Sequence, residues 1–263
     1  MKTDINRESA RQKGLAKHLV SALRSDEFVL YCQAIVPPSP GLAHRPFQEL
    51  LIRFQEEEAK LLPPGLFFPL LEDYRLLPFI DRWVVSRITQ WIGAARSVKQ
   101  DWEVPRNNIN LSADTLYDPH FAEFTCKHIQ TADLPAGALS FEITWPDASR
   151  HAESLRMMAA LLKEAGCGFT VADFDGSEDA YATIEELAPD FIKISSGVVR
   201  RLEAGESDSS AVESIHSRCQ SLGIATIAEC VESDALRQRL LRIGVDYVQG
   251  FGVSLPRPLT QEV

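Results

Sequence analysis

The sequence predicts an α/β fold, a modified (β/α)8 TIM barrel with an antiparallel first strand and an additional N-terminal helix. Two observations lead to this prediction. From Phe28 onward, short apolar runs alternate with longer amphipathic stretches, a pattern typical of a parallel sheet covered by helices. Eight strand-like runs over about 235 residues also match the size of such a barrel.

The chain divides into a short N-terminal segment and one large unit. Residues 1–25 are polar but carry Leu15, Leu19, Val20 and Leu23 at helical spacing. We therefore expect an amphipathic helix over residues 8–24, which packs on the barrel, mediates dimerisation or forms the end of a linker. Residues 26–263 are expected to form the barrel domain.

The expected strands are short and apolar, and most of the segments between them have helical periodicity. The strands are expected at Phe28–Val36, Phe47–Phe54, Asn108–Leu111, Leu139–Thr144, Phe169–Phe174, Phe191–Ile194, Ile224–Glu229 and Tyr247–Gln249. Helices are expected at Phe79–Arg96, Pro119–Ile129, Ser149–Ala165, Ser209–Leu222 and Ser233–Ile243.

The first two strands are joined by the segment Pro37–Pro46, which contains four prolines and is too short and proline-rich for a helix. These strands are therefore expected to be antiparallel. An open doubly wound sheet is the alternative architecture, but no G-x-G-x-x-G motif follows a strand.

Composition limits the kinds of molecule that the protein is expected to bind and indicates its cellular compartment. The net charge of −10 argues against general binding to nucleic acid or to an anionic membrane, which requires a basic face. Five dispersed cysteines without a C-x-x-C pair indicate reduced thiols, as in a cytoplasmic protein. No apolar run approaches the length of a transmembrane helix, so direct membrane insertion is not expected.

Polar residues stand in or at the ends of the expected strands, where barrel enzymes carry their chemistry. They are Glu49, Asn110, Glu142, Asp173, Lys193, Glu229 and Gln249. Burying carboxylates there is unfavourable unless they are hydrogen-bonded, paired or bound to metal. A single strand-end acid can be a helix cap or an arginine partner, but a convergent set is what a divalent metal and a phosphate ester need.

Eight motifs in order give the chain a resemblance to the EAL domain family of cyclic di-GMP phosphodiesterases and their inactive relatives. The motifs are Tyr31–Val36, Glu49-Leu50-Leu51, Ile52-Arg53-Phe54, Phe67–Glu72, Asn110-Leu111-Ser112, Glu142-Ile143-Thr144, Ala228–Glu232 and Gln249-Gly250-Phe251. Lys193-Ile194 adds the start of the family's K-I-D. The resemblance extends from Phe28 to Pro258 and implies the TIM-like barrel.

The departures from the family pattern affect the implied metal site. Ala172 stands where the resemblance implies a metal-binding aspartate, and Ser195 replaces the Asp of K-I-D. Trp145 replaces the second Glu of E-I-T-E, and the loop after Asp173, which the resemblance links to the metal site and a dimer contact, is altered. Glu49, Asn110, Glu142 and Asp173 would be remnants of the metal site, and Glu229 that of the general base. Asp175 is a candidate substitute ligand by strand alternation.

The residues retained from the pattern imply a nucleotide site. Arg53 matches the family arginine that contacts a ligand phosphate, a role suited to its bidentate donors. The positions implied to line the pocket or its metal site are Gln33, Glu49, Leu51, Arg53, Asn110, Glu142, Asp173, Lys193, Glu232 and Gln249.

Three interpretations of function remain open. The favoured one is a non-catalytic cyclic di-GMP receptor that needs no metal cofactor. The second is a nucleotide-independent regulatory protein that acts by protein–protein contact. The third is a weakly active phosphodiesterase that uses Mg²⁺ or Mn²⁺ and releases the linear dinucleotide. A regulatory protein partner is expected in the first two cases, and the resemblance is compatible with a homodimer.

Overall fold

The computed structural model describes residues 21–22, 27–39, 41, 44–55, 61–62, 64–99, 101–204 and 209–260. The expected N-terminal helix lies outside these residues except for Ser21 and Ala22, which are helical. The division at residue 25 therefore stays a prediction.

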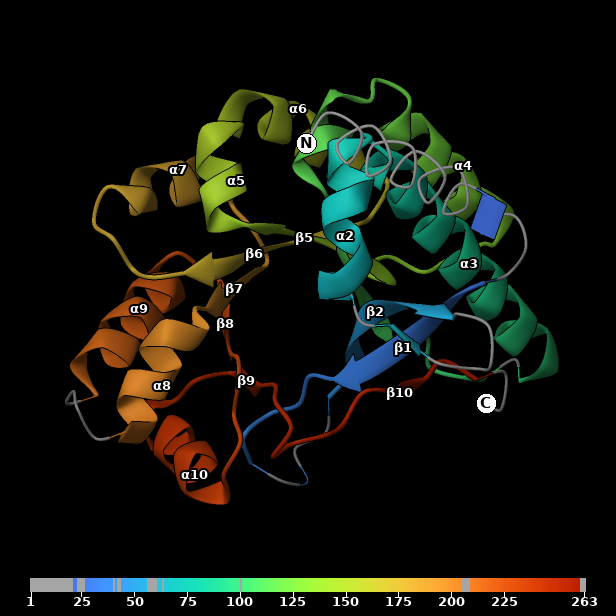
Figure 1. Ribbon diagram of the computed structural model, residues 1–263. Coiled ribbons are helices and arrows are strands. Elements are labelled where there is room, and N and C mark those ends of the chain that lie inside the picture. The colour runs from blue at the N-terminus through green and yellow to red at the C-terminus, as the bar shows by residue number, and fades with distance from the viewer. Residues whose placement is uncertain are drawn as a thin grey trace, which may run out of the picture.

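One mixed sheet forms the centre of the molecule (Figure 1). Its strands are β1 (Phe28–Ala34), β2 (Phe47–Gln55), β3 (Leu61–Leu62), β4 (Arg106–Asn110), β5 (Leu139–Thr144), β6 (Gly168–Phe174), β7 (Phe191–Ile194), β8 (Ala225–Ala228), β9 (Tyr247–Val248) and β10 (Arg257–Pro258). The order is β10-β1-β2-β4-β5-β6-β7-β8-β9, with β3 paired to β2. Strand β1 is antiparallel to β2 and β10, whereas β2 and β4 to β9 are parallel neighbours. The modified barrel with an antiparallel first strand is thus confirmed.

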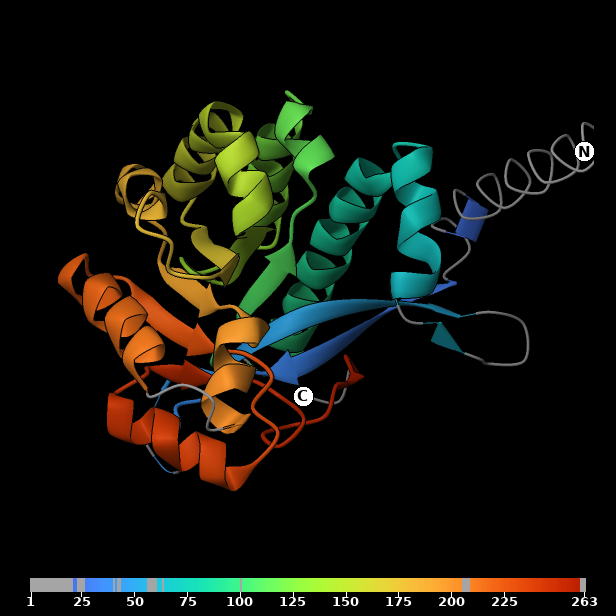
Figure 2. The same cartoon turned by 60° about the vertical axis from the view of Figure 1, so that its left-hand side comes forward.

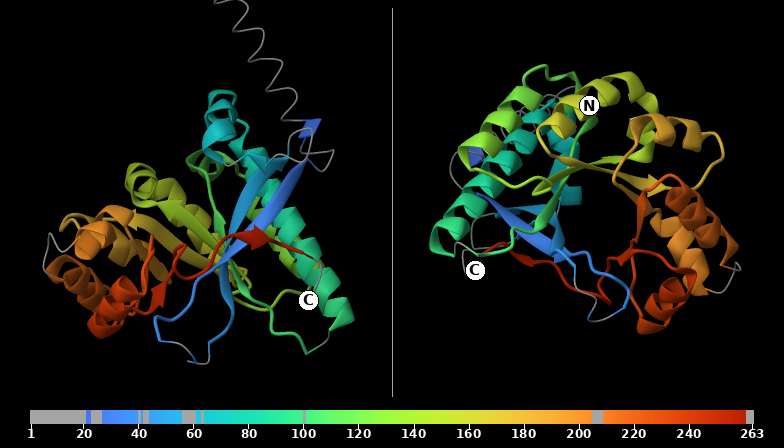
Figure 3. Two further views of the ribbon diagram at one scale, coloured as in Figure 1. Left: turned by 60° about the horizontal axis from the view of Figure 1, so that its bottom comes forward. Right: turned by 180° about the vertical axis from the view of Figure 1, so that it is seen from behind.

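The sheet closes just beyond the end of β1. Val36 and Val248 form an antiparallel bridge with backbone N–H···O distances of 3.1 and 2.8 Å. This bridge joins the segment after β1 to β9 and so closes the circuit of strands. The circuit is visible from behind in the right panel of Figure 3, whose left panel shows β10 lying along β1.

Helices surround the strands, as two views of the ribbon show (Figures 1 and 2). They are α2 (Pro64–Asp73), α3 (Leu77–Val98), α4 (Phe121–Thr131), α5 (Trp145–Arg150), α6 (Ala152–Glu164), α7 (Ala180–Leu187), α8 (Ser196–Ala204), α9 (Ser210–Ser221) and α10 (Asp234–Ile243), with a 3₁₀ helix η2 at Ala113–Tyr117. The helix expected at Ser149–Ala165 begins earlier and is split at His151. Helices α2, α7 and α8 were not expected. None of the described helices is long and apolar enough to span a membrane.

The local sequence explains where helices form and end. In α3, Ile80, Val84, Ile88 and Ile92 recur at helical spacing and are all buried. Helix α10 begins after Ser233, whose hydroxyl accepts a hydrogen bond from the backbone N–H of Leu236. It ends at Gly244, whose φ of 99° suits a glycine C-terminal cap.

The two ends of the barrel interior differ in character. At the N-terminal ends of the parallel strands, the rings of Phe47, Phe191 and Tyr247 contact one another with centroids 5.0 to 5.9 Å apart. At the C-terminal ends, charged side chains enter the interior. We call these two ends the N-terminal pole and the C-terminal pole.

Candidate functional site

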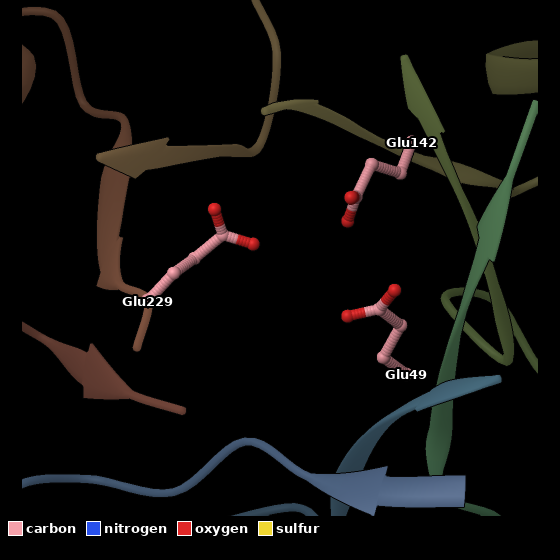
Figure 4. Close-up of side chains that lie close together, drawn as sticks. All are labelled: Glu49, Glu142 and Glu229. Atoms are coloured by element: carbon pink, nitrogen blue, oxygen red, sulfur yellow. The ribbon is translucent and has the colours of Figure 1, made fainter. Parts of the chain in front are cut away.

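Lys193, on β7, lies at the centre of an acidic cluster at the C-terminal pole. The cluster consists of Glu49, Glu142 and Glu229, whose carboxylates point toward one another from separate strands (Figure 4). The Lys193 Nζ atom lies 2.7 Å from Glu49 Oε2, 2.7 Å from Glu142 Oε2 and 3.4 Å from Glu229 Oε1. The lysine side chain is completely buried, so the ammonium group is the internal counterion of the cluster.

Two amides complete the surroundings of Glu49. Asn110 donates its Nδ2 to Glu49 Oε1 at 2.9 Å, and Gln249 donates its Nε2 to Glu49 Oε2 at 2.8 Å. The same Gln249 group donates to Gln33 Oε1 at 3.1 Å, and Gln33 in turn donates to the Ser254 carbonyl. Side chains from five strands, β1, β2, β4, β5 and β7, therefore form one hydrogen-bonded network with Glu229, Gln249 and the Ser254 carbonyl, which lie beyond the strand ends.

Asn108 and Thr170 orient Glu142 from the neighbouring strands β4 and β6. Asn108 donates its Nδ2 to Glu142 Oε2, and the Thr170 hydroxyl donates to Asn108 Oδ1 at 3.0 Å. Both supporting side chains are fully buried. A buried strand asparagine needs such partners because an unpaired amide in the core is costly. Asn108 was not predicted as a site residue, although three asparagines in one short strand were a signal in the sequence.

The surroundings shift the pKa values of Glu142 and Glu49 in opposite directions. Burial raises the pKa of Glu142 to about 8, and the carboxylates of Glu49 and Glu229 add to the rise against the opposing effect of Lys193. Burial acts in the same direction on Glu49, but Lys193 and the two amide donors outweigh it and hold its pKa below the usual value. Burial therefore favours the protonated form of Glu142, whereas Lys193 and the amide donors favour the ionised form of Glu49.

A β-bulge in β6 places Ala172 and Asp173 opposite the single residue Lys193. Ala172 is buried, whereas Asp173 is exposed and has a left-handed φ of 54°. The buried position of this pair is thus held by the residue that has no ligand atom. Asp175 accepts a hydrogen bond from the Ser177 backbone at 3.0 Å, and it is not a member of the acidic cluster.

One face of β2 carries Glu49, Leu51 and Arg53 at alternate positions. The Arg53 guanidinium lies over the ring of Tyr31 on β1, 5.5 Å from its centroid, and Nη1 donates to the Ile52 carbonyl at 2.8 Å. Within the described residues, no hydrogen bond or ion pair joins it to the cluster carboxylates; burial lowers the pKa of Arg53, and the nearby Tyr31 and Glu49 oppose this change. Arg53 therefore lies beside the cluster rather than in it.

A cavity of about 610 Å³ adjoins this face of β2. It is lined by Glu49, Leu51, Ile52, Phe68, Glu72, Arg75, Leu77, Ile80, Asp81, Val84, Ile109, Asn110, Leu111, Ser112, Ala113, Asp114, Asp147 and Leu50. Asp81 is buried at its wall, where its Oδ2 accepts hydrogen bonds from Ser112 and Thr115. Burial raises the pKa of Asp81 to about 6. Sequence analysis placed Asp81 within an expected helix and did not identify it as part of a site.

The predicted site residues thus fall into three groups. Gln33, Glu49, Asn110, Glu142, Lys193, Glu229 and Gln249 meet in the network, and Leu51 joins Glu49 and Asn110 at the cavity. Arg53 and Asp173 lie at the margin, and Asp173 acts on the pKa of Glu229. Glu232 is exposed and, in the part of the chain that the structure describes, has no hydrogen bond or ion pair with the network. Ser195 is buried at the end of β7, where it brings no carboxylate.

The donor set fits one hard divalent cation. One oxygen from each of Glu49, Glu142 and Glu229 lies within 4.8 Å of the others, which is the oxygen-rich arrangement that Mg²⁺ and Mn²⁺ prefer. The amide of Asn110 adjoins this set through its hydrogen bond to Glu49 Oε1. Ala172 and Ser195, where the family pattern has aspartates, add no carboxylate to it.

Comparison with known proteins gives the family. The model of the EAL domain matches residues 16–256. The cyclic di-GMP phosphodiesterase PdeB of Shewanella oneidensis is 31% identical over 262 residues, which cover 97% of this chain and 30% of that protein. The cyclic di-GMP phosphodiesterase PdeF of Escherichia coli is 26% identical over 97% of this chain and 33% of that protein. The chain therefore spans about a third of the length of these relatives.

Solved structures show the same architecture. The FimX EAL domain of Xanthomonas citri superposes with a TM-score of 0.87 at 23% identity and covers 97% of each chain. A complex of the PaMucR phosphodiesterase with c-di-GMP gives a TM-score of 0.83 at 25% identity, over 95% of this chain and all of that one. With a family model that covers most of its length and a barrel of the same topology, this chain belongs to the EAL domain family.

Proposed function

We propose that this protein is a cyclic di-GMP receptor whose site binds the nucleotide without hydrolysing it. The observation that carries the proposal is the combination of Lys193 at the centre of the three carboxylates with Ala172 at the buried position of the β6 bulge. The first feature supplies an internal positive charge, and the second removes an expected metal ligand.

The cavity and its margin support nucleotide binding. A volume of about 610 Å³ lies in the range of small-molecule sites. Arg53 on the same face of β2 supplies charged, bidentate donors for a phosphate. Carboxylates such as Glu72 and Asp114 supply acceptors for the N–H groups of a purine edge. The related PaMucR phosphodiesterase has been solved in complex with c-di-GMP.

The missing carboxylates support a non-catalytic site. Hydrolysis of a phosphodiester needs an activated water and stabilisation of negative charge, which a pair of metal ions supplies together. The carboxylates at the C-terminal pole would hold one ion, and Glu229 would then be the general base. Because the Lys193 Nζ atom lies 2.7 Å from both Glu49 Oε2 and Glu142 Oε2, a metal ion has to compete with an internal ammonium group for the same oxygens.

A second candidate function is a weakly active, metal-dependent cyclic di-GMP phosphodiesterase. Two observations favour it: the three carboxylates within 4.8 Å of one another, and the 31% identity to PdeB, a cyclic di-GMP phosphodiesterase. In that case Mg²⁺ or Mn²⁺ would be required, and the product would be the linear dinucleotide.

A calorimetric titration of cyclic di-GMP tests the proposal, with Arg53→Ala as the variant and Arg218→Ala as the matched control. The Arg218 guanidinium also lies over a tyrosine ring, 5.3 Å from the centroid of Tyr181. Arg218 is on α9, away from the candidate site. We expect micromolar or tighter binding in wild type and in Arg218→Ala, weakened about tenfold or more in Arg53→Ala, because a charged hydrogen bond to the phosphate is lost.

The same samples decide between the interpretations. Linear dinucleotide after incubation with Mg²⁺ or Mn²⁺, detected by chromatography, would establish the phosphodiesterase instead of the receptor. If wild type fails to bind with and without these ions, the nucleotide-independent regulatory protein is the remaining interpretation.

The expected setting of the receptor is cytoplasmic, with a regulatory protein partner and without nucleic acid. A homodimer is also proposed, although the loop after Asp173 that the family pattern links to dimerisation is altered. Analytical ultracentrifugation with and without cyclic di-GMP tests this part, and a monomer under both conditions would contradict it.

A further inference from the structure

We infer a second ligand site, for a small oxyanion, at the N-terminal pole between Arg45 and Arg106. This inference is independent of the proposed function because it concerns the opposite end of the barrel. Arg106 is the first residue of β4, and Asn110 of the network is its last. Four residues of extended strand separate the two positions by about 13 Å.

The two guanidinium groups lie beside the same glycine. A Cβ atom added at Gly137 would lie 3.0 Å from Arg45 Nη1 and 3.7 Å from Arg106 Nη2. Glycine at this position thus lets the backbone lie close to both guanidinium groups. Arg106 also lowers the pKa of Arg45, an effect that follows desolvation in size and that reflects the repulsion between neighbouring positive charges.

Arg45 is fixed in place but has an unused donor. Its Nε donates to the Val104 carbonyl and its Nη1 to the Ala136 carbonyl, both at 2.9 Å. Its Nη2 is buried and has no hydrogen-bond partner within the described part of the chain. A charged donor left unpaired in a buried place is unfavourable, so it is a natural point for an acceptor.

The guanidinium N–H donors of Arg106 have no partner in the described residues, and aromatic rings orient the plane of this group. Its guanidinium lies 4.6 Å from the ring centroid of Phe191 and 5.4 Å from that of Phe47. Among the described residues it has neither a hydrogen bond nor an ion pair, and it is half-buried. Stacking on aromatic faces orients a guanidinium for oxyanion recognition while leaving its N–H edge available.

The surroundings indicate a bound anion, and not an acidic side chain of the protein, as the partner of the two arginines. Glu103 attracts Arg45 at longer range but forms no ion pair with either arginine in the described residues. Two neighbouring guanidinium groups without an acidic partner match the fork geometry of phosphate and carboxylate groups. The ligand chemistry is therefore an oxyanion, either a phosphate or a carboxylate. The alternative is a solvated pair of cations that only covers the aromatic rings. It predicts no saturable binding of phosphate or acetate.

Titration with inorganic phosphate tests the site, followed by NMR of the arginine Nε–Hε groups at constant ionic strength. Acetate forms a second arm that distinguishes carboxylate from phosphate, and chloride serves as the control anion. We expect saturable, millimolar or tighter shifts of the Arg45 and Arg106 signals with phosphate or acetate. Arg53 lies at the opposite pole, so its shifts report any phosphate bound at the nucleotide site separately.

Variants make the test specific. Arg106→Gln keeps a polar side chain at this position but removes the charged guanidinium, so the midpoint of the Arg45 shift should rise about tenfold or more. Arg218→Gln, which removes an arginine from the ring of Tyr181, should leave the midpoint unchanged. Equal shifts with chloride, a linear response without saturation, or an unchanged midpoint in Arg106→Gln would each overturn the inference.

Discussion

Charged side chains have different kinds of partner at the two poles of this barrel. At the C-terminal pole, three carboxylates surround Lys193, and every one has at least one donor within 3.4 Å. At the N-terminal pole, Arg45 and Arg106 lie beside each other without an acidic partner in the described residues, and they rest on carbonyls and aromatic rings. The first arrangement is internally compensated, whereas the second depends on solvent or a ligand.

This difference indicates which charges belong to the fold and which are available for binding. A fully buried ion pair cannot lose one partner without leaving an uncompensated charge in the core. A half-exposed guanidinium can lose its charge at little cost. The predictions below test this contrast, beginning with the largest expected effect.

Removing the central ammonium group should be the most damaging change. In Lys193→Met, Glu49 and Glu142 lose their common counterion, and the free energy of unfolding should fall by about 3–5 kcal/mol at neutral pH. Urea unfolding in the presence of a chelator measures this loss. Lys127→Met, which removes an exposed lysine from α4, should change stability by no more than about 0.5 kcal/mol. A Lys193→Met protein as stable as the control would contradict the internal counterion.

The raised pKa of Glu142 predicts a dependence of stability on pH. An acid whose pKa is higher in the folded state binds its proton more tightly there, so stability falls as pH rises from its unfolded value of 4.5 to about 8. Glu142→Gln should flatten the upper part of this decline, between about pH 6 and 8. Asp81→Asn is the matched variant, because its pKa of about 6 confines its effect to lower pH.

Unfolding midpoints across this pH range, measured with a chelator, provide the comparison. Equal slopes for wild type and Glu142→Gln above pH 6 would show that Glu142 is ionised in the folded protein, contrary to the assignment made above.

Restoring a carboxylate at the β6 bulge should sharpen the account of the metal site. Ala172→Asp buries a fourth acid beside the cluster and should cost about 1–3 kcal/mol of stability in a chelator. Mg²⁺ or Mn²⁺ should recover part of this loss, as monitored by thermal unfolding. Hydrolysis of cyclic di-GMP should not return, because Ser195 and the loop after Asp173 are also altered. Full activity from this one change would refute that part of the proposal.

The smallest effect is expected at the N-terminal pole. Arg106→Gln loses a cation–π contact with Phe191 but also relieves repulsion with Arg45, so the free energy of unfolding should change by less than about 1 kcal/mol. Denaturant unfolding at low salt without added phosphate measures it. A loss as large as that of Lys193→Met would remove the contrast between the poles.

Sequence patterns predicted the strands better than the helices. Six of the expected parallel runs, such as Phe191–Ile194, coincide closely with strands because buried parallel strands are short and almost entirely apolar. The stretches at α2 and α8 were not predicted as helices. Helix α2 contains two prolines, which reduce its intrinsic propensity, and α8 follows directly on the strand containing Lys193. Packing against the barrel supplies the stability that their local sequence lacks.

The site could be predicted in composition but not in detail. The strand-end positions of Glu49, Glu142, Lys193 and Glu229 implied a convergent cluster, since parallel strands bring their C-terminal ends together. Strand alternation did not describe the segment after Val171, because a bulge with a left-handed Asp173 interrupts the register. The support of Glu142 by Asn108, and the partnership of Arg45 with Arg106, depend on neighbours that are distant in sequence.

By itself, the sequence determined the alternation of strands and helices, the antiparallel first strand, and the set of polar residues at one end of the barrel. These features follow from local periodicity, from the prolines between β1 and β2, and from the position of each residue within its strand. Only the tertiary structure decided that Lys193 occupies the centre of the acids, that Ala172 takes the buried position of the bulge, and that two arginines meet at the opposite pole. Such outcomes depend on distances between separate strands, and those distances are set by closure of the sheet rather than by any local segment.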